Sequence, residues 1–300
     1  FYSNTDKDSF DIQVTYLTRG IIWKCDYVLL LDINDVLADI SGWVTLTNNS
    51  GTAYKNASLT LVAGDVNQVE QENYMLREDR MMMSKAQSAP QFTEQAFFEY
   101  HMYDLGRKTS INNNQMKQVS LLEAQGFSVE KEYKVDFRNT NYHRQRITDE
   151  IKAPVEVTVN FINSEKNKLG MPLPKGTVRL YKVDPQGRQQ FIGEDSIDHT
   201  PKDEKVSIKV GEAFDVVAKK KMIDYKEVAQ DTFEVEWEFV INNHKKTPVK
   251  VIMFDAIMGQ WDVMRSTHRI GKENAFTLRY DLDVPADGEQ KVVYRLKIRV

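Results

Sequence analysis

Runs in which apolar and polar residues alternate one by one constrain the fold of this chain most strongly. The clearest run places glutamates at 234, 236 and 238 between Phe233, Val235, Trp237, Phe239 and Ile241, and two more runs occupy 276–284 and 292–300. Because the side chains of a strand point alternately to its two faces, each run predicts a strand with one buried face and one solvated face. Such strands are typical of antiparallel sheets. We therefore expect an all-β protein of antiparallel β-sandwiches, immunoglobulin-like at the C-terminus.

The same alternation, interrupted by turn residues such as Asp184-Pro185-Gln186-Gly187, predicts strands along most of the remaining chain. They are expected at 12–18, 27–33, 40–48, 56–63, 96–104, 115–122, 127–137, 155–163, 176–183, 189–197, 204–210 and 213–219. Residues 66–95 lack this pattern and are rich in Met, Gln and charged residues, which predicts either a partly helical excursion or a mobile insertion.

Three domains are expected from these patterns. They are an N-terminal β domain at 1–145 that carries the insertion at 66–95, a central β domain at 146–222, and a C-terminal immunoglobulin-like sandwich at 223–300. A short motif also repeats, since Trp43-x4-Asn48-Asn49 recurs as Trp237-x4-Asn242-Asn243. Two copies of one hairpin explain the repeat, and so does chance, because Asn is common in turns.

Composition argues against several classes of protein. The net charge of −4 gives no electrostatic footprint for nucleic acid, and the short basic runs at 219–221 and 244–246 are expected to be solvated. No apolar run reaches the ~18 residues of a membrane helix, so no membrane span is expected in this chain. The single cysteine, Cys25, excludes an intrachain disulfide. No signal peptide is visible after Phe1, so we expect any targeting segment to lie upstream.

The densest polar cluster comprises Glu194, Asp195, Asp198 and His199. Carboxylates beside a histidine can perform acid–base chemistry or hold a cation. A strand corner, in which Asp198 accepts the backbone amide of Thr200, explains the cluster as well and is the interpretation we favour. Cys25 lies on the apolar face of a strand, where a cysteine behaves as a small hydrophobic residue.

Other chemistry-bearing residues are scattered through the chain. The histidines are His101, His143, His199, His244 and His268, and none has the spacing of a local zinc motif. Glu99 and His101 share a strand face and could begin a metal site or simply be solvated. Residues 81–83 are three methionines, which could dock a partner or bind copper, although an incidental cluster is the interpretation we favour. Asn48 and Asn56 begin glycosylation sequons. The sequence thus assigns no catalytic, cofactor-binding or metal-binding residue.

Several segments resemble one family, the domain of unknown function 4139, which is the C-terminal domain of mucoidy-inhibitor-A-like proteins. The most specific is the run at 174–217, with its Pro-x-Gly turn and its Gly-Glu-Asp-x-Ile-x-His-Thr-Pro corner. Four other stretches are also similar to this family: the opening Val-Thr-Tyr-Leu-Thr-Arg-Gly at 14–20 with Trp23 and Tyr27 after it, residues 48–61, the strand at 120–124, and the final segment at 284–294. The resemblance implies export from the cytoplasm and brings no accepted catalytic residues.

Two functions from different classes remain open. The first is a non-catalytic binding or scaffolding module of the bacterial cell envelope, in the periplasm or at the cell surface, with a protein or glycan partner and no cofactor. The alternative is a hydrolase or metal-dependent enzyme whose site is assembled from separate strands. A pocket that contains several histidines and acids would favour the enzyme, whereas a shallow surface would favour the binding module.

Overall fold

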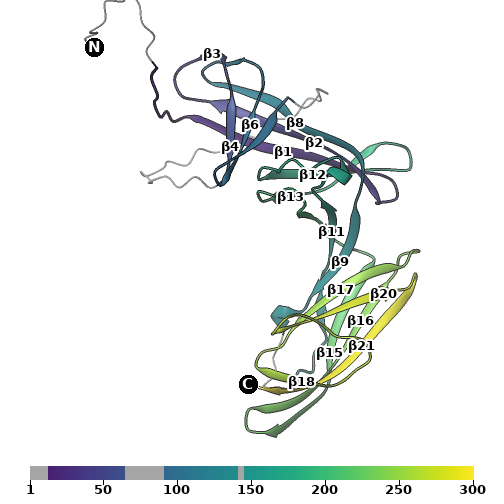
Figure 1. Ribbon diagram of the computed structural model, residues 1–300. Coiled ribbons are helices and arrows are strands. Elements are labelled where there is room, and N and C mark those ends of the chain that lie inside the picture. The colour runs from purple at the N-terminus through teal and green to yellow at the C-terminus, as the bar shows by residue number, and fades with distance from the viewer. Residues whose placement is uncertain (1–12, 65–90, 141–144) are drawn as a thin grey trace, which may run out of the picture.

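The computed structural model describes residues 13–64, 91–140 and 145–300, and Figure 1 shows them as strands arranged in an upper and a lower lobe. The helical elements within these residues are two 3₁₀ turns, η1 (Arg138–Thr140) and η2 (Glu165–Asn167), so the expected all-β class is confirmed. The immunoglobulin-like character of the C-terminal part stays a prediction. In the described part of the chain, no helix has the length and apolar character needed to cross a membrane.

The upper lobe is built on a five-stranded sheet in the order β13-β12-β1-β2-β8. Its strands are β1 (Ile21–Leu31), β2 (Leu37–Asn48), β8 (Gln115–Ser128), β12 (Gly176–Val183) and β13 (Gln189–Ile197). Neighbouring strands are antiparallel except β1 and β12, which are parallel. Two small sheets complete this lobe: β3 (Tyr54–Ala57) with β7 (Thr109–Ile111), and β4 (Thr60–Ala63), β6 (Tyr100–Asp104) and β5 (Thr93–Phe97).

The lower lobe is a sandwich of two sheets. One is antiparallel, in the order β10-β15-β16-β21-β18, and the other is mixed, in the order β14-β11-β9-β17-β20-β19. The antiparallel sheet comprises β10 (Ile151–Ala153), β15 (Val216–Ala229), β16 (Thr232–Asn243), β18 (Gln260–Ser266) and β21 (Gly288–Arg299). The mixed sheet comprises β9 (Glu130–Asp136), β11 (Val155–Ile162), β14 (Lys205–Glu212), β17 (Val249–Ala256), β19 (Gly271–Asn274) and β20 (Thr277–Val284), with β9 and β17 parallel.

The mixed sheet belongs to both lobes. Within β11, Val155 packs in the hydrophobic core of the lower lobe and Phe161 in that of the upper lobe. β9 follows β8 almost without interruption and adds Tyr133 and Val135 to the lower core. Figure 1 shows β9 and β11 running between the two lobes. Residues from the expected central domain at 146–222 therefore contribute to both cores, and the expected boundaries near 145 and 222 stay predictions.

Burial follows the predicted alternation for the apolar residues of the strands that carry it most cleanly. The expected solvated face of β16 is wrong at Glu236, which is 5% exposed and paired with Arg265 and Arg295. All five apolar residues of the β16 run are buried, with Trp237 at 0% exposure. Two ends depart from the pattern: Phe276, which precedes β20, is 58% exposed, and residues 13–18 of the strand expected at 12–18 form no strand. Most of the insertion expected at 66–95, including the methionines at 81–83, lies outside the described residues, as does His143.

The repeated Asn-Asn motif corresponds to a shared structural device. Asn48 at the end of β2 donates from Nδ2 to the carbonyls of Thr52 and Asn112, at 2.8 and 3.0 Å. Asn243 at the end of β16 donates equivalently to Thr247 and Pro285, at 2.9 Å each. In both, Oδ1 accepts the amide two residues later, and both side chains are buried. The device thus pairs Asn48 with Asn243, one position away from the alignment that the sequence motif suggests.

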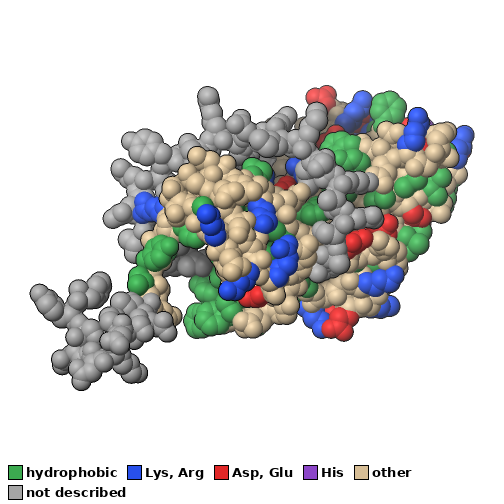
Figure 2. Space-filling view, turned by 90° about the horizontal axis from the view of Figure 1, so that it is seen from above, with side chains coloured by type: hydrophobic (Ala, Val, Ile, Leu, Met, Phe, Trp, Pro, Cys, Tyr) green, Lys and Arg blue, Asp and Glu red, His purple; other side chains and the backbone are tan. Residues whose placement is uncertain are grey.

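Surface charge is mixed on the face seen from above the upper lobe. Figure 2 shows Lys and Arg side chains together with Asp and Glu side chains on this face, with hydrophobic side chains between them.

Candidate functional site

The polar cluster at 194–199 forms contacts typical of a strand corner. Asp195 accepts the backbone amide of Lys209 at 2.7 Å, which ties β13 to β14. Glu194 lies 3.5 Å from the guanidinium of Arg179 on the neighbouring β12. His199 accepts the amide of Lys175 through Nδ1 at 3.2 Å. These side chains therefore connect the corner to the strands around it.

One detail of the predicted corner is wrong. The amide of Thr200 donates to the carbonyl of Leu173 at 2.9 Å, and not to the side chain of Asp198. Instead, the hydroxyl of Thr200 donates to the main-chain carbonyl of Asp198. The reciprocal bridge between Leu173 and Thr200 closes this corner, because each residue donates its amide to the other's carbonyl.

The described histidines lie in separate surroundings. His101 on β6 contacts Glu94 on β5 through Nδ1 at 2.7 Å, whereas Glu99 lies in the turn between these strands. His268 contacts the amide of Gln290 at 2.9 Å. Among the residues that the structure describes, no group of three or more His, Cys, Asp or Glu side chains has the arrangement of a metal site.

Cys25 is inside the upper core, at 2% exposure. Burial raises the pKa of its thiol to about 12, so the thiol stays protonated at neutral pH. A protonated and enclosed thiol is a poor nucleophile, which agrees with the interpretation of Cys25 as a small hydrophobic residue.

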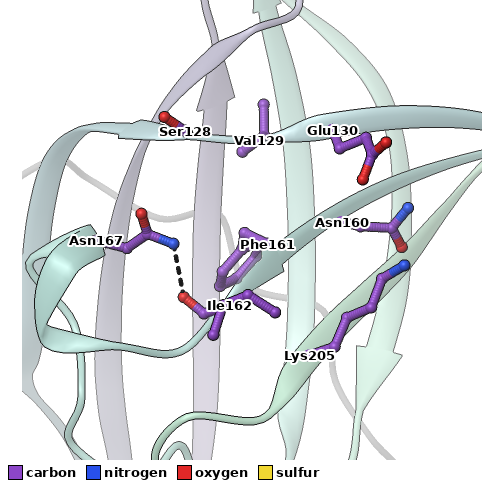
Figure 3. Close-up of a pocket in the computed structure, with 8 residues that line it drawn as sticks. All are labelled: Ser128, Val129, Glu130, Asn160, Phe161, Ile162, Asn167 and Lys205. Carbon is purple, nitrogen blue, oxygen red and sulfur yellow. Dashed lines mark hydrogen bonds between the residues drawn. The ribbon is translucent and has the colours of Figure 1, made fainter.

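A surface pocket of about 290 Å³ opens where the two lobes meet. Its lining comes from the junction of β8 and β9, from the end of β11 and the turn after it, and from the start of β14: Ser128, Val129, Glu130, Asn160, Phe161, Ile162, Asn167 and Lys205. Figure 3 shows Asn160 between the carboxylate of Glu130 and the ammonium of Lys205. The pocket therefore brings a carboxylate, an amide and an ammonium together over an apolar base.

Asn160 is the unusual residue of this pocket. Its side chain is 2% exposed, and its Nδ2 has a long contact of 3.4 Å to the hydroxyl of Thr158. Within the described part of the chain, its Oδ1 has no hydrogen-bond donor. A buried amide oxygen without a donor costs about 1–3 kcal/mol, so its presence in a pocket lining points to an external donor.

A second polar group is fully enclosed in the lower core. Lys220 on β15 donates to Asp255 on β17 at 2.8 Å, and Tyr294 on β21 donates its hydroxyl to the other oxygen of the same carboxylate. Burial dominates the behaviour of this ion pair: it lowers the pKa of Lys220 and raises the pKa of Asp255. The expectation that the basic run 219–221 is solvated is therefore wrong for its middle residue, which is 0% exposed.

The sequence did contain a signal for this pair. Lys220 has the same phase as the buried residues Ala218 and Met222 of its strand, and Asp255 has the same phase as the buried Met253. Alternation therefore places each charge on an apolar face. A run of three lysines, however, suggests solvent exposure more strongly than period-2 phase suggests burial, so the sequence alone does not predict the pair.

Comparison with known families agrees with the resemblance noted in the sequence. The family model described as a domain of unknown function, DUF4139, matches residues 12–300. The chain belongs to the DUF4139 family. A search among curated proteins finds no match.

Proposed function

We propose that the chain is a non-catalytic binding and scaffolding module of the bacterial cell envelope, and that the pocket at Asn160 binds a glycan. The observation that carries the proposal is the buried Oδ1 of Asn160, which lines a pocket and has no donor among the described residues. A sugar hydroxyl that donates to this oxygen would offset the cost of its burial.

The neighbouring groups suit the same ligand class. A hydroxyl both donates and accepts, so one sugar ring can donate to Glu130 and accept from Lys205 while it contacts Asn160. The pocket volume of about 290 Å³ is near the lower limit of ~300–1,000 Å³ for ligand sites, which favours one sugar unit over an extended chain. The strands shared between the lobes support the scaffolding part, because β9, β11 and β14, which carry Glu130, Asn160 and Lys205, are neighbours in one hydrogen-bonded sheet.

The envelope location rests on the family resemblance, which implies export in similar proteins. The same resemblance supports a finer proposal, that the chain corresponds to the C-terminal domain of mucoidy-inhibitor-A-like proteins. The alternating strands of the C-terminal part support another, that its sandwich is immunoglobulin-like.

A glycan array followed by calorimetric titration of the best ligand tests the proposal. Asn160→Leu should abolish binding while the free energy of unfolding stays equal or rises, because the variant removes an amide oxygen for which the described part of the chain supplies no donor. Asn163→Leu is the matched control three residues away: its buried amide donates to Met171 and Pro201 and accepts from Gly170, so this variant should lose about 1–3 kcal/mol of stability.

Full binding by Asn160→Leu, or a wild-type protein that binds no glycan on the array, would overturn the proposal. Cleavage of the glycan during the titration would instead support the alternative of a hydrolase.

A further inference from the structure

The buried group in the lower lobe suggests a chemical reaction within the protein, independent of what the pocket binds. Lys220 and Asp255 come from the two opposing sheets of the sandwich, and Nζ lies 2.8 Å from Oδ1. Both side chains are enclosed, at 0% and 1% exposure. We propose that Lys220 and Asp255 condense to an amide, an isopeptide bond that covalently joins the two sheets.

The surroundings favour the reactive forms of both groups. Nζ of Lys220 lies 4.1 Å from the centre of the Trp237 ring and 5.4 Å from that of Phe239, so it is held among aromatic faces. Burial lowers the pKa of Lys220 and raises the pKa of Asp255, and both shifts favour transfer of a proton from the ammonium to the carboxylate. An amine with a free lone pair is the nucleophile that amide formation needs.

The reaction balances without any further reactant. The lone pair of Nζ forms a bond to Cγ of Asp255, and the bond from Cγ to one carboxyl oxygen breaks with its electron pair staying on that oxygen. The two protons that the ammonium loses end on the departing oxygen, which leaves as water. Well-oriented groups of this kind react as if one were present at about 10⁵–10⁸ M, which replaces the activation that a free acid and amine would require.

Tyr294 is placed to assist. Its hydroxyl donates to Oδ2 of Asp255, the carboxyl oxygen that does not contact Lys220. This hydrogen bond withdraws electron density from the carboxyl carbon and can pass a proton to the departing oxygen. Burial and the nearby Asp255 raise the pKa of Tyr294, so its hydroxyl stays protonated and remains a hydrogen-bond donor to the carboxyl group.

The intact mass of the purified protein tests the proposal directly. The measured mass of the wild-type protein should be lower, by the mass of one water molecule, than the mass calculated from its sequence. After trypsin digestion, the fragment that contains Lys220 should be joined to the fragment 251–265, which contains Asp255. An internal imide at an aspartate also loses water but joins no two fragments, so the digest distinguishes the two.

Matched variants locate the bond. Lys220→Met should have the full mass calculated from its sequence. Lys221→Met, at the exposed neighbouring residue, should still be lighter than calculated by one water molecule. Tyr294→Phe should leave a measurable fraction at full mass, whereas Tyr280→Phe, in the adjacent stacked ring, should not. A wild-type protein of full mass, a mass loss that persists in Lys220→Met, or a link mapped to other residues would overturn the bond. Complete mass loss in Tyr294→Phe would overturn the role of the tyrosine.

Discussion

Replacing Trp237 by alanine should be one of the most destabilising single changes in the lower lobe. The side chain is 0% exposed and lies on β16, which is paired on both sides, with β15 and β21. Truncation of a buried aromatic residue to alanine typically costs about 3–5 kcal/mol, and the cost rises when the surroundings cannot collapse into the cavity.

The surroundings of Trp237 have little freedom to move. Met222 and Tyr294 face it on the two neighbouring strands, and Lys220 lies against its ring. Strand pairing fixes the backbone of these three residues. The contact with Asp255 also keeps the Lys220 side chain from moving into the cavity that the variant creates. These constraints favour the upper end of the range, but the buried indole Nε1 has no acceptor among the described residues, so its removal offsets part of the cost. We therefore expect a loss of about 4 kcal/mol. A loss of that size is a large fraction of the ~5–15 kcal/mol that stabilises a typical domain.

Urea titration followed by circular dichroism measures this loss, because the signal does not depend on the missing tryptophan. Trp261→Ala is the control: this half-buried residue lies on the edge strand β18, and its indole donates to the carbonyl of Ala275 at 3.0 Å. It should cost about 1–2 kcal/mol, because the variant loses this hydrogen bond and part of the packing of the indole against the lower core. A loss below about 1 kcal/mol for Trp237→Ala would refute the argument.

Two further predictions concern strand pairing and acid stability. Gly176→Ala should destabilise the upper lobe by about 1–3 kcal/mol in the same titration, because a Cβ at this position would lie 2.4 Å from a backbone oxygen of β1. Gly271→Ala is the control and should be nearly neutral, because its Cβ would lie 3.4 Å from the nearest atom. Equal losses of stability in the two variants would contradict the steric explanation. Asp35→Asn should cost about 1.5–3 kcal/mol at neutral pH, since burial opposes the charge of Asp35 but hydrogen bonds from Lys131 and Lys182 outweigh it and hold its pKa below the ordinary value. A carboxyl whose pKa is lowered in the folded state stabilises the protein above the unfolded pKa of about 4, and this stability is lost as the pH falls through the folded pKa. The thermal denaturation midpoints of the wild type and Asp35→Asn should therefore converge in acid. A difference that stays constant down to low pH would contradict the assignment.

How far the sequence predicts this protein depends on the range of the interaction. The alternation around Trp237 predicts strand β16 and its buried face, because both follow from neighbouring residues alone. The parallel pairing of β9 with β17 is invisible to such reasoning, since the two strands are far apart in sequence and neither encodes its partner. Phe276 shows a related failure: it continues the apolar phase of β20, but it precedes the strand and faces solvent.

The candidate sites show the same division. The turn residues around His199 predict a strand corner, but they do not predict that the amide of Thr200 donates to the carbonyl of Leu173. Asn160 gave no signal, because a single Asn in a strand pattern is unremarkable until the structure shows that its oxygen has no donor among the described residues. Lys220 and Asp255 gave a signal of phase, but only the packing of two sheets brings them into contact.

The strands shared between the lobes also affect the order in which the chain can fold during synthesis. The upper core draws on residues up to Ile208, so it can close once β14 has left the ribosome. At that point β9 pairs with β11 on one side, while its other edge waits for β17, which is synthesised later. A half-made chain therefore presents an open strand edge, the kind of surface on which nascent chains pair with one another. Slow translation between β14 and β17 should thus favour aggregation, and rapid translation through this interval should favour the native fold.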